Sequence, residues 1–347
     1  MSRIFITGDA GFIGFHLAKQ LLALGHTVAG YDAISAYYSP RLKQSRLDLL
    51  CQSSEFSHTT GRLEDARELA GAMRTFQPDI VVHLAAQAGV RYSITNPEEY
   101  ISSNIVGSAT LLDVLREVPP AHLMLASTSS VYGGNVRAPF SELDTTDAPL
   151  SLYAATKRSM ESLAHSFSHL HQVPTTVFRF FTVYGPWGRP DMALFKFVRA
   201  ILNDEPIDIY GFGKMRRDFT YVDDLVRAIL KLSQAVPAVA APIGERDSLS
   251  KVAPFRIVNI AGGSPTELMT FVSAIEHSLG RIARKNLMPM QPGDVVSTFA
   301  DTRLLHDLIG ELPSTPVPEG VARFVDWYMA DGVSTLDVSG VTQGRTH

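Results

Sequence analysis

The sequence lacks several features that would assign it to particular classes of protein. It has one cysteine, Cys51, among 347 residues, so an internal disulfide is excluded and a reducing compartment is expected. Its 31 Lys and Arg residues are nearly balanced by 35 Asp and Glu residues, with no basic stripe and no block of like charge. This balance gives no indication of a nucleic-acid or polyelectrolyte partner.

Long apolar runs and metal-ligand clusters are missing as well. No run reaches the roughly 18 apolar residues that a membrane span needs, so we expect no membrane association. The first apolar run begins at Arg3 and leaves no room for a signal peptide, which predicts a cytoplasmic protein. His165 and His169 have i, i+4 spacing on a predicted helix but no acidic or cysteine partner, so we predict no metal site.

The first 180 residues alternate between short apolar runs and longer segments of helical period. Runs such as Ile80-Val-Val-His-Leu84 are apolar on both faces, as in a sheet that helices cover on both sides. The alternation predicts an α/β fold with a doubly wound parallel Rossmann sheet. The predicted strands are 3–7, 27–32, 55–60, 79–85, 121–127 and 174–182, and the predicted helices are 12–24, 64–76, 98–117 and 151–171.

The pattern changes after about residue 183, where turn-rich pieces alternate with short helices and strands. We therefore expect a Rossmann domain over residues 1–182, to which later segments return, and a smaller C-terminal α/β lobe that occupies most of 183–330. Residues 236–254 are rich in Ala, Pro and Ser and are predicted to form a surface loop. Residues 331–347 lose periodicity and are predicted to be a flexible tail.

A glycine-rich turn, Gly8-Asp-Ala-Gly11-Phe-Ile-Gly14, separates the first strand from the first helix. Glycines allow a backbone to approach a pyrophosphate closely, and the helix N-terminus supplies N–H donors. The second strand ends at Asp32, whose carboxylate would bind the adenosine ribose and repel a 2′-phosphate. Glycines that serve packing alone and a solvated strand-end acid are the simpler alternatives. Together the two features predict NAD as the cofactor and make 1–182 an NAD-binding domain.

Tyr153 and Lys157 lie one turn apart near the start of a long predicted helix. Positions i and i+4 share a face, which brings the ammonium group close to the phenol. A tyrosine base must lose a proton whose reference pKa is about 10, and positive charge nearby favours the phenolate. Such a pair is common on helix surfaces by chance. After the fifth strand of an NAD-binding sheet, it becomes a candidate catalytic pair.

These motifs resemble those of the extended short-chain dehydrogenases/reductases, in the branch of nucleotide-sugar epimerases and dehydratases, over nearly the whole chain. In that family the tyrosine is the base on a sugar hydroxyl, the lysine holds the nicotinamide ribose, and a Ser or Thr before VYG completes a triad. The resemblance implies Tyr153, Lys157 and Thr128 as catalytic residues. The expected cofactor contacts are Gly8, Gly11, Phe12, Ile13, Gly14, Asp32, Leu84, Ala85, Ala86, Asn104, Ser127, Tyr153, Lys157 and Phe180.

Four hydroxyl side chains, Ser127 to Ser130, end the fifth predicted strand. Related sugar dehydratases carry Asp and Glu at the positions of Ser129 and Ser130, because elimination needs a separate acid and base. UDP-glucuronate decarboxylases carry Glu at the position of Ser130. Ser129 and Ser130 can bind a sugar and its carboxylate, but hydroxyls do not protonate a leaving group efficiently near neutral pH. The remaining chemistry is epimerisation by reversible hydride transfer. The alternative is that both serines only satisfy backbone groups.

The blocks at 85–92, 178–197, 214–224 and 290–294 resemble those of UDP-glucuronate 4-epimerases. A UDP-hexuronate brings a diphosphate and a carboxylate, and arginine suits both oxyanions. The resemblance implies Arg217 for the diphosphate, Arg189 and Thr182 for the carboxylate, and Phe195 with residues 206–210 around the uracil. An ion pair with Asp191 is the alternative for Arg189. The expected substrate contacts are Arg91, Thr128, Ser129, Ser130, Thr182, Arg189, Phe195, Arg217 and Asp294.

Two other functions stay open at this point. An epimerase of neutral UDP-hexoses is one, although UDP-galactose epimerases carry Asn where Thr182 stands; a non-catalytic NAD-binding regulatory protein is the other. Ala33 replaces the Asn that often follows the strand-two acid, and Arg62 stands where an Asp near adenine is usual, so we expect fewer or different adenine contacts. The family resemblance also implies a homodimer through the helices at 98–117 and 151–171.

Overall fold

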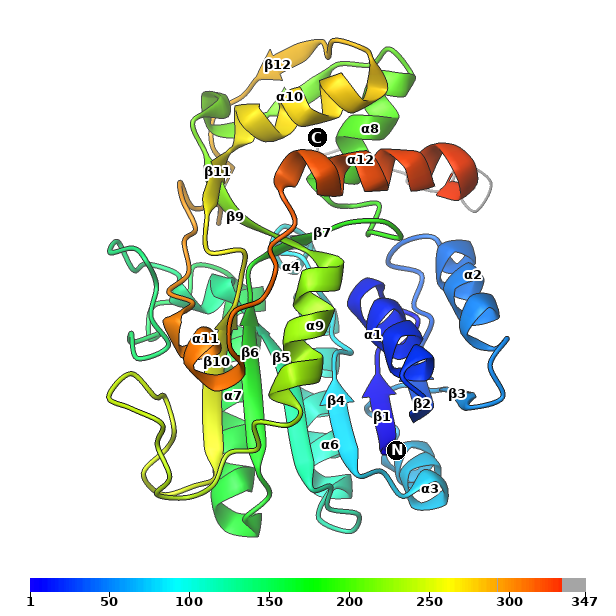
Figure 1. The fold of residues 1–347 in the computed structure, drawn as a ribbon, viewed down its shortest axis with the longest axis vertical. Helices are drawn as coiled ribbons and strands as arrows, with labels where there is room; N and C mark the ends of the chain where they lie inside the picture. The colour runs from blue at the N-terminus through cyan, green and yellow to red at the C-terminus, as the bar shows by residue number, and fades with distance from the viewer. Residues whose placement is uncertain (292, 333–347) are drawn as a thin grey trace.

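A computed structural model describes residues 1–291 and 293–332 of the chain (Figure 1). Its largest element is a seven-stranded, fully parallel sheet with the order β10-β6-β5-β4-β1-β2-β3. The doubly wound Rossmann sheet predicted from the sequence is confirmed. The strands are β1 (Arg3–Thr7), β2 (Thr27–Asp32), β3 (Phe56–Thr60), β4 (Ile80–His83), β5 (His122–Thr128), β6 (Thr175–Phe180) and β10 (Phe255–Ile260).

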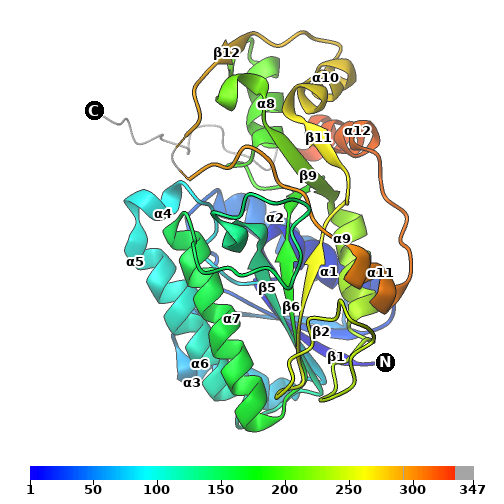
Figure 2. The ribbon, with the colours of Figure 1, turned by 90° about the vertical axis from the view of Figure 1, so that its left-hand side faces the viewer.

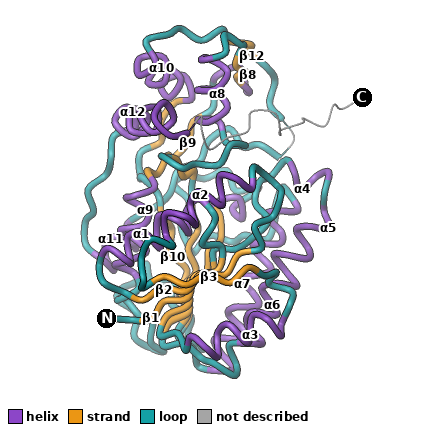
Figure 3. The backbone as a smooth tube through the Cα atoms, turned by 90° about the vertical axis from the view of Figure 1, so that its right-hand side faces the viewer, coloured by secondary structure: helices purple, strands orange, loops and turns teal. Residues whose placement is uncertain are grey.

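The sheet is buried on both faces because successive side chains of each strand enter opposite apolar cores. In β1, Ile4 and Ile6 pack into one core, whereas Phe5 packs into the other. Helices supply the second wall of each core, and Figures 2 and 3 show the strands as a layer between them. One layer comprises α3 (Ala66–Phe76), α5 (Pro97–Tyr100), η1 (Ile101–Val106), α6 (Gly107–Val114) and α7 (Leu152–His171); the other comprises α1 (Phe12–Ala23), α2 (Pro40–Leu50), α9 (Val222–Leu232) and α11 (Arg303–Ile309).

The predicted helix at 98–117 has an irregular centre. Residues 97–114 are helical throughout, but η1 (Ile101–Val106) has the wider turn of a π-helix. Such turns often occur at functional sites because they redirect individual side chains. Here the turn contains Asn104, whose buried amide bonds to both backbone groups of Gln87 just beyond β4.

The seventh strand, β10, lies beyond the strands that the sequence pattern predicted. It pairs with β6 in parallel, with Phe255 opposite Thr175 and Ile260 opposite Phe180. Between β6 and β10 the chain passes through the lobe and returns as α9, and it returns again after β10 as α11. The two helices contact each other, and in addition α9 contacts α1 and α11 contacts β10. Distant segments of the chain therefore complete the Rossmann part.

The smaller lobe stands above the carboxyl ends of the sheet strands (Figure 1). Its aromatic core includes Phe195, Phe271 and Phe324 and extends to Tyr38 and Leu42 near the start of α2. The lobe therefore packs directly on the β2–α2 segment. Its strands and helices are β7 (Thr182–Tyr184), β8 (Ile207–Ile209), β9 (Arg216–Tyr221), β11 (Pro265–Glu267), β12 (Lys285–Leu287), α8 (Ala193–Leu202), α10 (Leu268–Leu279) and α12 (Val317–Trp327).

The remaining segments are short turns and loops. Residues 236–254 form an irregular loop without helix or strand. Apart from Asp331 and Gly332, the predicted tail at 331–347 lies outside the described residues. No described helix has the length and apolarity that crossing a membrane demands. The short helical turns are α4 (Tyr92–Thr95), η2 (Ser129–Tyr132), η3 (Tyr210–Gly213) and η4 (Tyr328–Gly332).

Candidate active site

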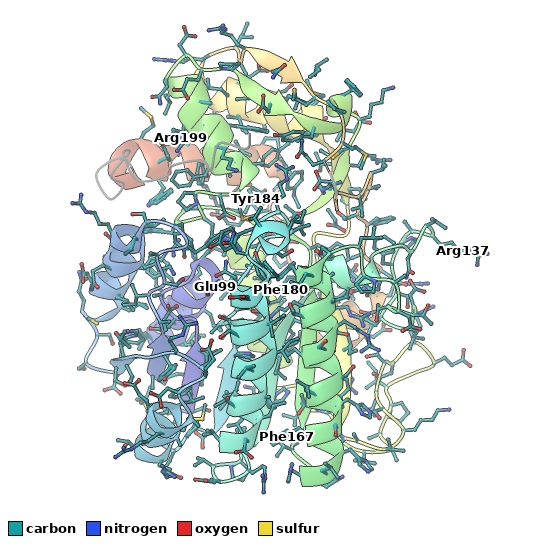
Figure 4. The ribbon with its side chains drawn as sticks, turned by 180° about the vertical axis from the view of Figure 1, so that it is seen from behind. Glu99, Arg137, Phe167, Phe180, Tyr184 and Arg199 are labelled. Carbon is teal, nitrogen blue, oxygen red and sulfur yellow. The ribbon has the colours of Figure 1, made fainter. Side chains whose placement is uncertain are left out.

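A large cleft opens at the carboxyl ends of the sheet strands, between the sheet and the lobe. It encloses about 1710 Å³ of space that is open to solvent. The strand order reverses between β1 and β4, and ligands of doubly wound folds bind at this point. Figure 4 shows Phe180 and Tyr184 at this level, where the helices end and the lobe begins. The cleft lies where the sequence motifs predicted a dinucleotide site.

The glycine turn forms one wall of the cleft and requires its glycines. Gly8 has φ of +82°, and a Cβ there would lie 2.7 Å from the backbone nitrogen of Ala85. A Cβ on Gly14 would lie 2.1 Å from the carbonyl oxygen of Gly8. No side chain caps the first turn of α1, so its N–H groups are left for an anion. This cradle suits a pyrophosphate.

Asp32 stands at the end of β2 and lines the same cleft. One of its carboxylate oxygens accepts the backbone N–H of Ile34 at 2.7 Å, which leaves the other oxygen for a ribose hydroxyl. The glycine cradle and this acid together fit NAD. Thirteen of the fourteen expected cofactor contacts line the cleft, namely Gly8, Gly11, Phe12, Ile13, Gly14, Asp32, Leu84, Ala85, Ala86, Ser127, Tyr153, Lys157 and Phe180.

Asn104 is the expected cofactor residue that does not line the cleft. It is 1% exposed, and its side chain bonds to the backbone of Gln87 and to Thr156 Oγ1 at 3.0 Å. The structure therefore places Asn104 behind the cleft wall. There it fixes the segment after β4 and the start of α7 rather than facing a ligand.

Tyr153 and Lys157 project from the first turns of α7 into the cleft. The helix begins here because Ser151 is its N-cap and accepts the backbone N–H of Ala154 at 3.2 Å. Thr128, at the end of β5, lines the cleft beside them and interacts with the Tyr153 phenol. The three predicted catalytic residues are thus brought together.

The electrostatics of the phenol differ from the sequence expectation. Burial raises the pKa of Tyr153, and the charge of Arg189 and the hydrogen bond with Thr128 only partly oppose it. The sequence reasoning assigned the stabilisation of the phenolate to Lys157 together with the positively charged nicotinamide, whereas the side chains that lower the pKa here are Arg189 and Thr128. Burial also lowers the pKa of the Lys157 ammonium to about 8, against the opposing effect of Glu161. The protein's own charges therefore leave the phenol protonated near neutral pH.

The hydroxyl row has two separate environments. Ser127 donates to the buried carboxylate of Glu161 at 2.6 Å. Thr128 Oγ1 accepts the backbone N–H of Ser130 at 3.2 Å, so the row bends into η2. Ser129 and Ser130 line the cleft together with Thr182 from β7. At this place in the cleft, the row therefore offers a ligand hydroxyl groups and no carboxylate.

Arg189 lies on the turn between β7 and α8 and lines the cleft. It forms an ion pair with Asp191, in which Nε is 3.0 Å from Oδ1 and Nη2 is 2.5 Å from Oδ2. The alternative pairing considered from the sequence is therefore present. It does not remove Arg189 from the site, because the arginine still contributes to the cleft wall.

Three further substrate candidates form a group outside the lining of the cleft. Arg91 donates to Asp294 at 3.0 Å, and its guanidinium lies 4.5 Å from the ring centre of Tyr210. Arg217 donates to the backbone carbonyl of Val296 at 3.2 Å, and Arg91 and Asp294 both influence its pKa, which burial lowers. The group joins the segment after β4 to the lobe.

Phe195 is not available to stack on a base. It is 2% exposed, and its ring packs edge-on against Phe324 at 5.7 Å and Tyr328 at 5.2 Å. The family resemblance implied Phe195 for the uracil, but the residue occupies the buried face of α8. The structure therefore places Phe195 in the core of the lobe.

Lys43 and Tyr37 are polar residues of the cleft lining that the sequence reasoning did not identify as site residues. Lys43 lines the cleft, is 5% exposed, and donates to both oxygens of Ser35, at 2.9 and 3.0 Å. Tyr37 also lines the cleft and donates to Asp191 at 3.1 Å. Lys43 could have been noticed, since a charged residue on the apolar face of a helix signals a buried partner or ligand. Tyr37 lies in a loop and gives no such signal.

The two histidines with i, i+4 spacing have other hydrogen-bond partners. Among residues 1–291 and 293–332, no three His, Cys, Asp or Glu side chains are grouped so as to hold an ion. His165 bonds instead to Ser250 at 2.8 Å, and His169 bonds to the carbonyl of Val252 at 2.6 Å. Both histidines anchor the loop at 236–254.

Fold and site together define a dinucleotide-dependent sugar-modifying enzyme of the short-chain dehydrogenase/reductase type. The profile of the NAD dependent epimerase/dehydratase family matches residues 4–243, and the chain belongs to that family. It is 56% identical over 329 residues to the "Probable UDP-glucuronate 4-epimerase" of Rhizobium meliloti (strain 1021), covering 94% of this chain and 96% of that protein.

Other relatives agree with this grouping. UDP-glucuronate 4-epimerase 1 of Arabidopsis thaliana is 41% identical over 333 residues, which cover 94% of this chain and 76% of the relative. Among solved structures, the UDP-glucuronic acid 4-epimerase of Bacillus cereus in complex with UDP-glucuronic acid and NAD superposes with a TM-score of 0.84 at 30% identity. That match covers 94% of this chain and 99% of the other.

Proposed function

We infer that the chain is an NAD-dependent UDP-glucuronate 4-epimerase, which interconverts UDP-glucuronate and UDP-galacturonate. The observation that carries this assignment is the cleft that combines Tyr153, Lys157 and Thr128 with a hydroxyl row and Arg189. The relatives named above support the substrate, and the glycine cradle with Asp32 supports NAD as the cofactor. The reaction is an isomerisation, because the substrate is neither oxidised nor reduced overall.

The proposed chemistry begins with proton transfer at the C4 hydroxyl of the sugar. When bound, NAD would supply a reversible hydride acceptor for the chemistry at C4 and a positive charge. Tyr153 accepts the hydroxyl proton as C4 is oxidised to a ketone, and returns it after the sugar has presented its other face. Lys157 holds the nicotinamide ribose, and Thr128 keeps the phenol in position. The burial that raises the pKa of Tyr153 makes the added positive charge necessary.

The carboxylate of the substrate needs its own restraint. The 4-keto intermediate is a β-keto acid, which loses CO₂ when its carboxylate bond aligns with the carbonyl π system. We propose that Arg189, Thr182, Ser129 and Ser130 hold the carboxylate out of this alignment. Hydroxyls and a guanidinium bind the anion without offering a general acid, so epimerisation is favoured over elimination.

The nucleotide half is assigned by position. We propose that Arg91, Arg217 and Asp294, which meet between the sheet and the lobe, rearrange around the UDP diphosphate. Residues 183–330 would then serve mainly the nucleotide sugar and residues 1–182 mainly NAD, with α9, β10 and α11 completing the NAD-binding part. Since Phe195 is buried, Tyr210 of the expected segment 206–210, against which Arg91 packs, is the aromatic candidate that we retain near the uracil.

Assembly and location are further parts of the proposal. We propose a homodimer through the outer surfaces of the helices at 97–114 and 152–171, supported by the 45% and 48% exposure of Ile101 and Val106. A cytoplasmic location is supported by the presence of only one cysteine in the sequence. Light scattering of the purified protein tests the dimer.

The direct test of function is product analysis. The purified protein is incubated with UDP-glucuronate, and the sugar is identified by NMR; UDP-galacturonate is the expected product. UDP-glucose in a parallel reaction tests the neutral-hexose alternative, and faster turnover of UDP-glucose would overturn the assignment. Bound NAD without turnover of either sugar would instead favour the regulatory alternative.

A further inference from the structure

The turn that carries Arg189 is held by α2 and by the loop that connects β2 to α2. Arg46 of α2 is fully buried and donates from Nη1 to the carbonyl of Ala10, in the glycine turn, at 2.8 Å. From Nη2 it donates to the carbonyl of Trp187 at 2.6 Å, two residues before Arg189. One guanidinium thus connects the cofactor cradle to the start of the Arg189 turn.

The other end of the turn is held by Tyr37. Its hydroxyl donates to Oδ2 of Asp191 at 3.1 Å, and its ring centre lies 5.8 Å from the guanidinium carbon of Arg189. Burial and the adjacent Asp191 carboxylate raise the pKa of Tyr37, so its hydroxyl stays a donor at any physiological pH. Gly89 permits the contact, because a Cβ there would lie 2.7 Å from the Tyr37 hydroxyl oxygen.

The ion pair with Asp191 uses only one edge of the Arg189 guanidinium. A guanidinium has five N–H donors, and Asp191 receives one from Nε and one from Nη2. Neither hydrogen bond to Asp191 uses Nη1, and the Tyr37 hydroxyl is the other group that interacts with the guanidinium. A second carboxylate can therefore bind the Nη1–Nη2 edge in the same plane, without displacing the first.

We propose that Asp191 and Tyr37 are positioning residues that fix the plane of Arg189 and so make the site selective for a sugar carboxylate. This inference rests on the proposed function and deepens it. An unrestrained arginine has many rotamers and pays an entropic cost on binding, whereas a clamped one presents its free edge in advance. A neutral hydroxymethyl group would leave that edge unpaired inside the cleft, which costs binding energy.

The test separates the carboxylate from the rest of the ligand. Dissociation constants of UDP-glucuronate, UDP-glucose and UDP are measured by calorimetry on the NAD-loaded protein and on Asp191→Asn and Tyr37→Phe. We expect weakening of UDP-glucuronate by about 10-fold for Asp191→Asn and about 3-fold for Tyr37→Phe, since a charge-assisted pair is stronger than a neutral hydrogen bond. The constants for UDP and UDP-glucose should change by less than about 2-fold.

Tyr92→Phe is the matched control. The ring centre of Tyr92 lies 4.8 Å from that of Tyr37, and the substitution removes a hydroxyl without changing the partners of Asp191. If the variants bound all three ligands more weakly by the same factor, both residues would have only a structural role, and the inference would be overturned. Tighter binding of UDP-glucuronate to Asp191→Asn would overturn it too, by making Asp191 a competitor. If the wild type converts UDP-glucuronate and the variants bind all three ligands with wild-type dissociation constants, only the positioning role is contradicted. If the wild type neither binds nor converts UDP-glucuronate, the proposed function itself is contradicted.

Discussion

Ser127 donates a 2.6 Å hydrogen bond to Glu161, the residue one helical turn beyond Lys157 on α7. Glu161 also receives two hydrogen bonds from Arg179 of β6, at 3.0 and 2.9 Å. All four side chains are at most 3% exposed. Beside the cofactor cleft, the Glu161 carboxylate therefore offsets two buried cations, Arg179 and Lys157, and also lies 3.6 Å from the more exposed Arg158 guanidinium.

Replacement of Glu161 by Gln should destabilise the protein strongly. The change leaves Arg179 and Lys157 buried without a carboxylate, and removal of one partner from a buried ion pair typically costs about 3–5 kcal/mol. The free energy of unfolding, from urea titration, should fall by that order. Glu245→Gln, in the exposed loop, is the control and should be neutral. A loss below about 1 kcal/mol in Glu161→Gln would contradict the charge balance described here.

Substitution of Gly14 by Ala should abolish NAD retention. The new Cβ would lie 2.1 Å from the Gly8 carbonyl oxygen, so the turn must shift away from the pyrophosphate position. NAD released on denaturation of the purified protein measures occupancy. Gly71→Ala in α3 is the control: nothing lies within 4 Å of its Cβ, and the change should stabilise the helix by about 0.5–1 kcal/mol. Full NAD occupancy in Gly14→Ala would count against the cradle.

Glu142 should make stability depend on pH. It is 7% exposed, accepts the backbone N–H of Asn259 at 2.8 Å, and burial raises its pKa to about 7. In the unfolded chain its pKa is about 4.3, so between these values the folded protein binds the extra proton. The free energy of unfolding contributed by this group therefore falls as pH rises from about 4.3 to 7.

Glu142→Gln removes this titration and keeps the hydrogen-bond acceptor. The stability of the variant relative to the wild type should rise by about 2–3 kcal/mol between pH 5 and pH 8. Denaturant titrations of both proteins across this pH range measure the difference in their free energies of unfolding. The contributions of the other ionisable groups cancel in this difference. A difference that does not vary with pH would show that Glu142 is ionised in the folded state throughout.

The sequence predicted most of the sheet and the reactive centre because both depend on local patterns. Short continuous apolar runs predict buried strands, and the helical spacing of Tyr153 and Lys157 predicts a shared face, without any knowledge of distant contacts. The strand β10 (Phe255–Ile260) could not be placed in the sheet, since its pairing with β6 closes a long excursion through the lobe. Burial of Phe195 was equally hidden, because its partners Phe324 and Tyr328 lie more than 120 residues further along the chain.

Charged networks were the other part that local patterns could not predict. Arg91, Arg217 and Asp294 were expected to contact substrate, but no local pattern indicated that Arg91 and Asp294 pair with each other. Glu161 was missed although it lies four residues after Lys157, on the same face of α7. The sign of the pKa shift of Tyr153 depends on burial, which the sequence did not reveal.

Truncation of Arg189 to Ala should impair handling of the carboxylate. Loss of a bidentate charge-assisted contact should raise KM for UDP-glucuronate by about 10–100-fold, and a freed carboxylate should let UDP-pentose appear by loss of CO₂. Both are measured by NMR of the products over time. Arg137→Ala, on an exposed loop away from the cleft (Figure 4), is the control. Unchanged kinetics and products would remove Arg189 from the site.

The central claim is that one enzyme-bound hydride leaves C4 and returns to the same carbon while Tyr153 carries the proton. UDP-glucuronate with deuterium at C4 tests it most directly, with mass spectrometry and NMR of the UDP-galacturonate formed in ordinary water. The account predicts that nearly all of the deuterium stays at C4, and that Tyr153→Phe forms the product at a rate lower by at least about 100-fold. Exchange of the label with solvent, or full activity of Tyr153→Phe, would contradict it.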